Sequence, residues 1–269
     1  TSSVTNMGMM FAVCSSLKSI DVSGFNTSNV ENMRSMFNRC HNLISIDISK
    51  FDTSKVTSMA LMFYICKNIS SIDISNFDTS NLLSMYQMFG NCTNLVTVKL
   101  GNMNTSSVTD MRYLFCYDHN LKSADLSSFD TSHVTHMGWM FFHCYKIESI
   151  IFSKSFNTSN VVSMYSMFSH CKVMTSFNLS NFDTCKVTEM CYMFNNCQKL
   201  KFLDLSNFSP TNITNMDTMF NSCKALLCLN LRNFKINGDT IILYKRMMGL
   251  RTTCTQSLKL LLQDVPVPF

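Results

Sequence analysis

The sequence predicts an α/β solenoid, because it is built almost entirely from one repeated phrase. A phrase of 26 residues recurs nine times, starting at Thr1, Thr27, Thr53, Thr79, Thr105, Thr131, Thr158, Thr184 and Pro210. Each copy combines a hydrophobic period typical of a short helix with one typical of a short strand. A fixed period of this length indicates coils that bury their apolar sides against their neighbours. We expect nine coils with a concave parallel sheet and short convex helices.

The first half of each copy predicts the helix. In the first copy, apolar residues recur at i, i+3, i+4 and i+7, namely Met7, Met10, Phe11 and Cys14. This spacing places all four on one helical face. Methionine occupies the first of these positions, and phenylalanine the third, in all nine copies. Because methionine fills irregular gaps and contacts aromatic rings favourably, we interpret both columns as core.

The second half of each copy predicts a strand and a corner. Leu17, Ile20 and Val22 end in a two-residue alternation, which suits a short strand. The Thr that opens the first eight copies is interpreted as a corner residue whose hydroxyl satisfies backbone groups. The sixth copy has one extra residue near Lys154 and Ser155, which we expect to form a small bulge after the strand.

The repeat also sets the domain organisation. The phrase continues to Lys235, so residues 1–235 are predicted to form the solenoid and residues 236–269 a C-terminal cap or tail. Thr1 falls on the first position of the phrase, with no capping segment before it. Since solenoids generally need an atypical terminal unit with a polar outer face, we expect the natural protein to extend before Thr1.

The consensus phrase carries a family resemblance. It reads F-[DN]-T-S-x-V-T-x-M-x-x-M-F-x-x-C-x-x-L-x-x-[IL]-D-[ILV]-S and resembles the BspA-like leucine-rich repeat, which is shared with a mycoplasma lipoprotein repeat family of unassigned function. The resemblance covers residues 1–235. It implies a leucine-rich-repeat solenoid at the cell surface or secreted, with a role in adhesion or in binding host or matrix proteins. It brings no catalytic residues.

Eight of the 13 cysteines form one column: Cys14, Cys40, Cys66, Cys92, Cys144, Cys171, Cys197 and Cys223. Asp118 takes this place in the fifth copy. Metal ligands must converge on one point, whereas these cysteines stand one per coil along a line. Side chains that point the same way in register rarely meet disulfide geometry. We interpret the column as buried thiols, and we predict no metal and no cofactor.

The strand offers an outward-facing column of carboxylates: Asp21, Asp47, Asp73, Asp125 and Asp204. Serine columns accompany them, so the concave face is small, polar and mildly acidic. One interpretation is a binding face for a protein or glycan ligand. The other is that short polar residues simply suit the solvent side of a parallel sheet. Lys99, Ile151, Asn178 and Asn230 interrupt the column, which argues against a Ca²⁺ site in every coil.

Eight Asn-x-Ser/Thr triplets are candidate N-glycosylation sites, which would carry glycans if the protein is secreted from a eukaryotic cell. They are centred on Asn26, Asn68, Asn91, Asn104, Asn157, Asn178, Asn207 and Asn212.

Composition excludes several function classes. The formal charge of +5 is spread over many copies, which argues against nucleic-acid binding. The chain lacks the roughly 18–20 consecutive apolar residues of a membrane span. It also lacks a nucleophile–base pair at a useful spacing, so we predict that it is not an enzyme.

The sequence therefore predicts a non-enzymatic recognition or adhesion protein, extracellular or at the cell surface. The alternative is a structural protein whose solenoid ends stack into a fibre or surface layer, as an end-to-end homo-oligomer.

Overall fold

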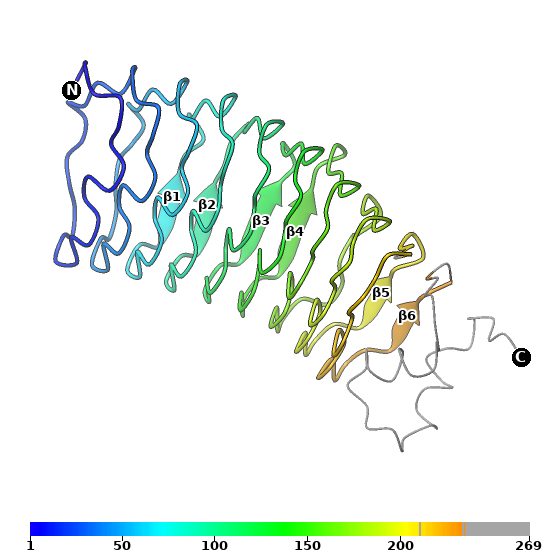
Figure 1. Ribbon diagram of the computed structural model, residues 1–269. Coiled ribbons are helices and arrows are strands. Elements are labelled where there is room, and N and C mark those ends of the chain that lie inside the picture. Colours follow the sequence, from blue (N-terminus) through cyan, green and yellow to red (C-terminus); the bar gives the residue numbers. More distant parts are fainter. Residues whose placement is uncertain (210, 233, 235–269) are drawn as a thin grey trace, which may run out of the picture.

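The computed structural model describes residues 1–209, 211–232 and 234. Successive coils lie side by side and form one gently curved array (Figure 1). Eight isolated parallel bridges connect equivalent positions of neighbouring coils, from Asn6–Asn32 through to Glu189–Asn215. The molecule is therefore a solenoid of stacked coils, as the repeat predicts. The predicted cap or tail, residues 236–269, lies outside the described residues.

The described residues include six short strands in three parallel pairs. Strand β1 (Ser71–Asp73) pairs with β2 (Thr97–Lys99), β3 (Ser123–Leu126) with β4 (Ser149–Phe152), and β5 (Phe202–Asp204) with β6 (Cys228–Asn230). Each residue pairs with its equivalent in the next coil, as Ser71 does with Thr97. We call the side of the solenoid that carries these strands the strand face.

The short convex helices predicted from the sequence are absent from the described residues. In the second coil the expected helix consists of successive turns, in which N–H groups donate to carbonyls three residues earlier, as from Met36 to Met33 (3.2 Å) and from Cys40 to Phe37 (3.2 Å). Ser35 and Arg39 have positive φ angles of 57° and 60°. A right-handed helix has no place for such residues. The equivalent segments of all the coils form what we call the turn face.

Backbone hydrogen bonds between coils explain why no helix forms. Along this segment of the second coil, every other N–H group donates to a carbonyl of the third coil at 2.7–3.0 Å: Met33 to Ser58, Ser35 to Ala60, Phe37 to Met62 and Arg39 to Tyr64. In a helix these N–H groups would bond within their own segment. The same ladder recurs between later coils, so the stacking of coils replaces the internal hydrogen bonds of a helix.

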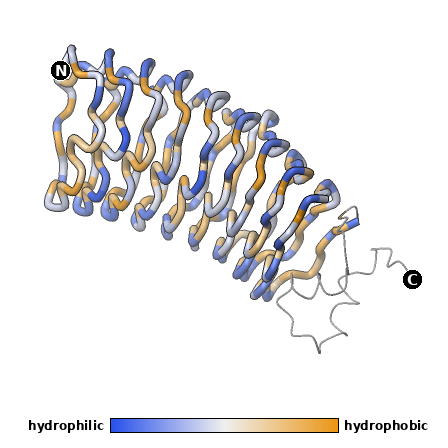
Figure 2. The backbone as a smooth tube through the Cα atoms, in the orientation of Figure 1, coloured by the Kyte–Doolittle hydropathy of each residue, from blue (hydrophilic) through white to orange (hydrophobic). Residues whose placement is uncertain are grey.

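The turn segment nevertheless buries the residues that the helical pattern selects. Two consecutive turns repeat after four residues, close to the 3.6 residues of a helical turn. Met33, Met36, Phe37 and Cys40 are accordingly all buried. Figure 2 shows the result as hydrophobic and hydrophilic stretches that alternate along each coil and recur from coil to coil.

A stack of phenylalanine rings forms the centre of the core. The rings from Phe11 to Phe220, one per coil, lie nearly parallel, with centroids 5.3–6.1 Å apart. Most of the rings in this stack are fully buried. Offset stacking of this kind adds to the free energy of burying each ring. The prediction that the Phe column is core is confirmed.

The Thr column forms buried clamps between coils. The Thr27 hydroxyl donates to the carbonyl of Asp52 (2.9 Å) and accepts the N–H of the same residue (2.8 Å). Thr105 and Thr158 make the same pair of bonds with Asp130 and Asp183. These threonines are 0–2% exposed. The interpretation as corner residues that satisfy backbone groups is confirmed.

The extra residue of the sixth copy is accommodated directly after β4. Ser153 turns inward, is buried, and its hydroxyl donates to the Phe129 carbonyl. Beyond it, the Thr131 hydroxyl reaches the carbonyl of Asn157, 26 residues away, where the other clamps span 25. The insertion thus lies at the end of a strand, as predicted.

The cysteine column consists of buried thiols in the interior coils. Cys40, Cys66, Cys92, Cys144, Cys171 and Cys197 have no exposed surface, and their Sγ atoms lie 3.0–3.4 Å from a Phe carbonyl of the preceding coil. All the described cysteines are free. Burial raises the pKa of the Cys40 thiol to about 11, so it stays protonated and can donate. Cys14, in the first coil, is exposed.

Asp118 replaces a thiol of this column with a buried carboxyl group. It is fully buried; Oδ1 accepts the N–H of Cys92 (2.8 Å), whereas Oδ2 has no hydrogen-bond partner. Burial raises the pKa of Asp118 well above its usual range. An uncompensated buried charge is costly, so the neutral acid is the form that the fold accepts.

Glycine substitutions distinguish the turn segment from a helix. Arg39→Gly should raise the free energy of unfolding by about 0.5–1 kcal/mol, because glycine relieves the left-handed conformation there. Arg34 is an exposed residue of the same segment without a positive φ. Arg34→Gly should lower the free energy of unfolding by a similar amount, because glycine loses more backbone entropy on folding. Urea denaturation measures both. A loss of stability in both variants would indicate a helix.

Restoring the thiol at position 118 should stabilise the protein at neutral pH. Asp118→Cys should raise the free energy of unfolding at pH 7.5 by about 1–3 kcal/mol, because it removes an unsatisfied buried group. The pKa of Asp118 is raised in the folded state, so the native protein loses stability as pH rises above the unfolded pKa of about 4. The gain should therefore shrink towards pH 4.

Urea titrations at pH 7.5 and pH 4 test this prediction, with Asp125→Cys on the strand face as control. An equal gain at both pH values would refute it.

Candidate recognition surface

The predicted Asp column lies exposed on the strand face, and its carboxylates stabilise turns. Oδ1 of each Asp accepts the N–H of the Ser two residues later at 2.8–3.1 Å, in Asp21, Asp47, Asp73, Asp125 and Asp204. Hydrogen bonds from the Ser75 hydroxyl and N–H, together with Lys99, lower the pKa of Asp73 to about 2. The carboxylates are thus accessible to a ligand, but each already serves its own turn.

The candidate glycosylation sites differ in how their side-chain amides are used. Seven are exposed, and Asn91 is half-buried. The Nδ2 atom of Asn207 donates to the carbonyls of Leu179 (2.9 Å) and Phe182 (2.7 Å), and that of Asn212 to Cys185 (2.7 Å). A glycan bonded to this nitrogen would disturb these contacts. In Asn26, Asn104, Asn157 and Asn178 the side-chain oxygen accepts the N–H of the following Ser instead.

A row of aromatic side chains crosses five coils on the turn face. We call it the aromatic ladder; it consists of Tyr86, Tyr113, Trp139, Tyr165 and Tyr192. Consecutive ring centroids are 5.7, 4.8, 4.6 and 5.6 Å apart. Four of the side chains are half-buried, and Tyr192 is 37% exposed. The ladder is therefore a continuous, ordered and accessible aromatic surface.

The turn geometry places these side chains in line. Tyr113, Trp139 and Tyr192 occupy the first left-handed position of their coils, with φ angles of 58–60°. Tyr86 and Tyr165 stand one residue earlier, directly after the first Met of the phrase. The rings from these two neighbouring positions form one continuous row, in which Tyr113 and Trp139 stack in parallel and the other pairs are tilted or edge-on. Coils before and after the ladder carry smaller or non-aromatic residues at both positions.

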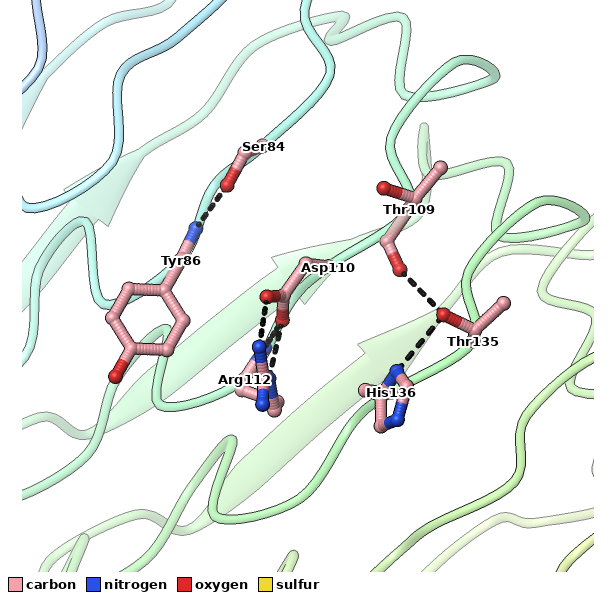
Figure 3. A network of polar contacts seen from close by, with 7 residues as sticks. All are labelled: Ser84, Tyr86, Thr109, Asp110, Arg112, Thr135 and His136. Atoms are coloured by element: carbon pink, nitrogen blue, oxygen red, sulfur yellow. Dashed lines mark hydrogen bonds and ion pairs between the residues drawn. The ribbon is translucent and has the colours of Figure 1, made fainter.

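Polar groups flank the ladder at its N-terminal end (Figure 3). The guanidinium of Arg112 donates from Nε and Nη2 to the carboxylate of Asp110, at 2.9 and 2.6 Å. It also lies 5.4 Å from the centroid of the Tyr86 ring. The Thr135 hydroxyl donates to the Thr109 carbonyl (3.3 Å) and lies 2.9 Å from Nδ1 of His136. An apolar strip with a polar border is the usual layout of a protein-binding patch.

The stacking decides which part of each ring a ligand can contact. Tyr113 and Trp139 lie nearly parallel, with an interplanar angle of 7°, so the facing sides of the two rings cover each other. Ring edges and polar tips remain for a ligand. A protein that packs against the edges and hydrogen-bonds the Tyr hydroxyls fits it well.

A second aromatic group lies further along the same turn segments. It contains three histidines, His119, His143 and His170, which we call the histidine row. The rings of His143 and His170 stack at 4.0 Å, and His119 stacks on Tyr145 at 4.6 Å. Within the described residues, no group of three or more His, Cys, Asp or Glu side chains could hold a metal ion.

Sequence reasoning missed the aromatic ladder, although a signal was present. Tyr or Trp follows the first Met of the phrase by one or two residues in five consecutive copies. In a helix these two positions point about 100° apart, so the five residues do not form one column. Only the turn geometry brings both positions into the same stack.

None of the described segments is a helix long and apolar enough to cross a membrane.

Several solved structures of bacterial leucine-rich-repeat proteins are similar to the chain. A leucine-rich cell surface protein from Faecalibacterium prausnitzii is 16% identical, with a TM-score of 0.33 over 91% of this chain and 79% of that one. A leucine-rich repeat protein from Bacteroides ovatus is 17% identical, with a TM-score of 0.41 over 87% and 66%. The T. pallidum leucine-rich repeat protein is 17% identical, with a TM-score of 0.37 over 79% and 80%.

No curated protein sequence matches the chain significantly. One family model matches three overlapping segments, residues 1–97, 85–178 and 148–259. Together they span residues 1–259, which include the whole predicted solenoid, and they confirm the resemblance carried by the repeated phrase. The chain belongs to the family described as Mycoplasma protein of unknown function, DUF285.

Proposed function

We propose that this protein is a non-enzymatic recognition protein, extracellular or at the cell surface, which binds a protein ligand through the aromatic ladder. The observation that carries the proposal is the accessible row of contacting rings formed by Tyr86, Tyr113, Trp139, Tyr165 and Tyr192. The resemblance of the repeat to BspA-like surface proteins supports the location.

The ladder has the properties of a binding hot spot. Tyrosine and tryptophan dominate the energetics of protein interfaces, since each buries a large area with few rotatable bonds. Here the rings are already ordered by stacking and by the hydrogen-bonded turn beneath them. Binding then costs little further side-chain entropy. The ladder is also confined to five coils, as expected of a site and not of a feature needed for stacking.

The strand face is the alternative surface for a protein or glycan ligand. Its Asp column is exposed, as described above. We rank it second, because its exposed large apolar side chains, Ile151 and Phe202, stand on separate strand pairs among small polar residues. Its carboxylates also already accept hydrogen bonds from their own turns. Variants on the two faces separate the possibilities.

A truncation in the centre of the ladder should weaken binding strongly. The protein is screened against an array of purified extracellular matrix and cell-surface proteins, and each binder is titrated by biolayer interferometry. Trp139→Ala should weaken a specific interaction by about 30-fold or more, because the Trp139 ring contacts those of both neighbours at the middle of the patch.

Two matched variants control this experiment. Leu61→Ala truncates an apolar side chain at the same left-handed position of a coil outside the ladder, and should leave affinity unchanged. The triple variant Asp47→Asn, Asp73→Asn, Asp125→Asn changes only the strand face and should also bind normally. If only the triple variant loses binding, the ligand uses the strand face. Concentration-dependent filaments in sedimentation, with no binder on the array, would support the end-to-end fibre.

A further inference from the structure

The histidine row brings several basic groups into one cluster across three coils. His143 lies between its neighbours: its ring stacks on His170 at 4.0 Å, and its Nδ1 is 2.7 Å from the Tyr145 hydroxyl. His119 stacks on the other side of the cluster, against Tyr145 at 4.6 Å. Lys172 places its ammonium group 4.1 Å from the centroid of the Tyr145 ring.

Positive charge in this cluster has no carboxylate partner. In the described part of the chain, the ion pairs are Lys99–Asp73 and Arg112–Asp110, neither of which involves the row. The other titratable groups around it are Tyr117, which packs against His119 and His143, and Tyr145. Asp118, the residue between Tyr117 and His119 in the chain, is fully buried, and its carboxyl group accepts the N–H of Cys92.

The three imidazoles are therefore held in their neutral form. Burial, followed by the proximity of His170, His119 and Lys172, lowers the pKa of His143 to about 4. Burial and Lys172 also lower the pKa of His119 and His170. Protonation would place like charges about 4 Å apart in a partly desolvated site, where they repel strongly.

We propose that the histidine row is an acid-sensitive device: neutral imidazoles join the turn segments of three coils at neutral pH, and their protonation in acid separates those segments locally. Histidine clusters act in this way wherever charge change alters a packed interface. The affected segments are those around residues 113–119, 139–145 and 165–172.

The direction of the effect follows from linkage. The pKa of each histidine is lower in the folded state than the unfolded value of about 6.5. The stability that the row contributes is therefore complete above pH 6.5 and is lost as pH falls towards 4. This is opposite in sign to the effect of Asp118, which favours the folded state in acid.

The protein contains a built-in reporter for this transition. Trp139 is the single tryptophan of the sequence, and it lies four residues from His143 on the same turn segment. Its ring stacks on that of Tyr113 at 4.8 Å and lies tilted against that of Tyr165 at 4.6 Å. Loosening of these coils would expose the indole and shift its emission to longer wavelength. Trp139 emission is measured without a ligand, so its response to acid does not depend on the proposed binding function.

The test is a pH titration of the whole chain from 7.5 to 4.5. We expect Trp139 emission to shift to the red below pH 6. After correction for intrinsic rates, amide exchange should accelerate about tenfold or more in residues 113–119, 139–145 and 165–172, but not in coils one to three. The double variant His143→Gln, His170→Gln should lose this transition. His41→Gln, outside the row, should retain it.

A second variant tests the same device should the double variant fail to fold. Lys172→Met keeps the length and apolar stem of the side chain but removes its charge. Without the charge of Lys172, the protonated imidazoles would repel less in the folded state. Acid would then destabilise the packed coils less, so the transition should move to lower pH. An unchanged transition in Lys172→Met and in the double variant would overturn the proposal. So would a wild-type protein in which all coils respond to acid together.

Discussion

The ladder of backbone hydrogen bonds along the turn face is the interaction on which the rest of the structure depends. Four alternate N–H groups of a turn segment donate to carbonyls of the next coil, as from Ser35 to Ala60 and from Phe37 to Met62. All of them point the same way along the solenoid. To direct them so, each segment places two residues in the left-handed region, none of them glycine. Each such residue costs roughly 1–2 kcal/mol, which the hydrogen bonds and the buried Met and Phe side chains must offset.

This constraint explains the chemistry of the columns. Neighbouring coils are held in register, so identical residues lie next to one another. Only a side chain that packs well against its own kind in the next coil can fill a column. Phenylalanine does so through parallel rings, threonine through a clamp to the next coil, and cysteine through a thiol that donates to a carbonyl. Asp118 violates the rule. Its Oδ2 atom has no hydrogen-bond partner, and burial raises its pKa well above the usual range.

The same register creates the surfaces that we assign to function. Side chains that point outward from the turn face also lie next to one another. Similar substitutions in neighbouring coils therefore form a continuous strip on the surface. The aromatic ladder and the histidine row arise in this way, on the same turn segments of the middle coils. The surfaces that we propose for recognition and for acid sensitivity therefore lie where the repeat varies, whereas its invariant residues hold the coils together.

The sequence by itself determined the solenoid, the repeat register, the buried Met, Phe and Cys columns and the insertion near Lys154 and Ser155. These follow from periodicity, which records which side chains share an environment. Tertiary structure alone decided that the segment Met33–Cys40 forms turns and not a helix. Both bury the same residues, and the choice depends on hydrogen bonds to a coil 26 residues away. The tertiary structure also decided that the five aromatic rings form one row. Tyr86 and Tyr113 occupy different positions of the phrase, and their rings meet only through that turn geometry.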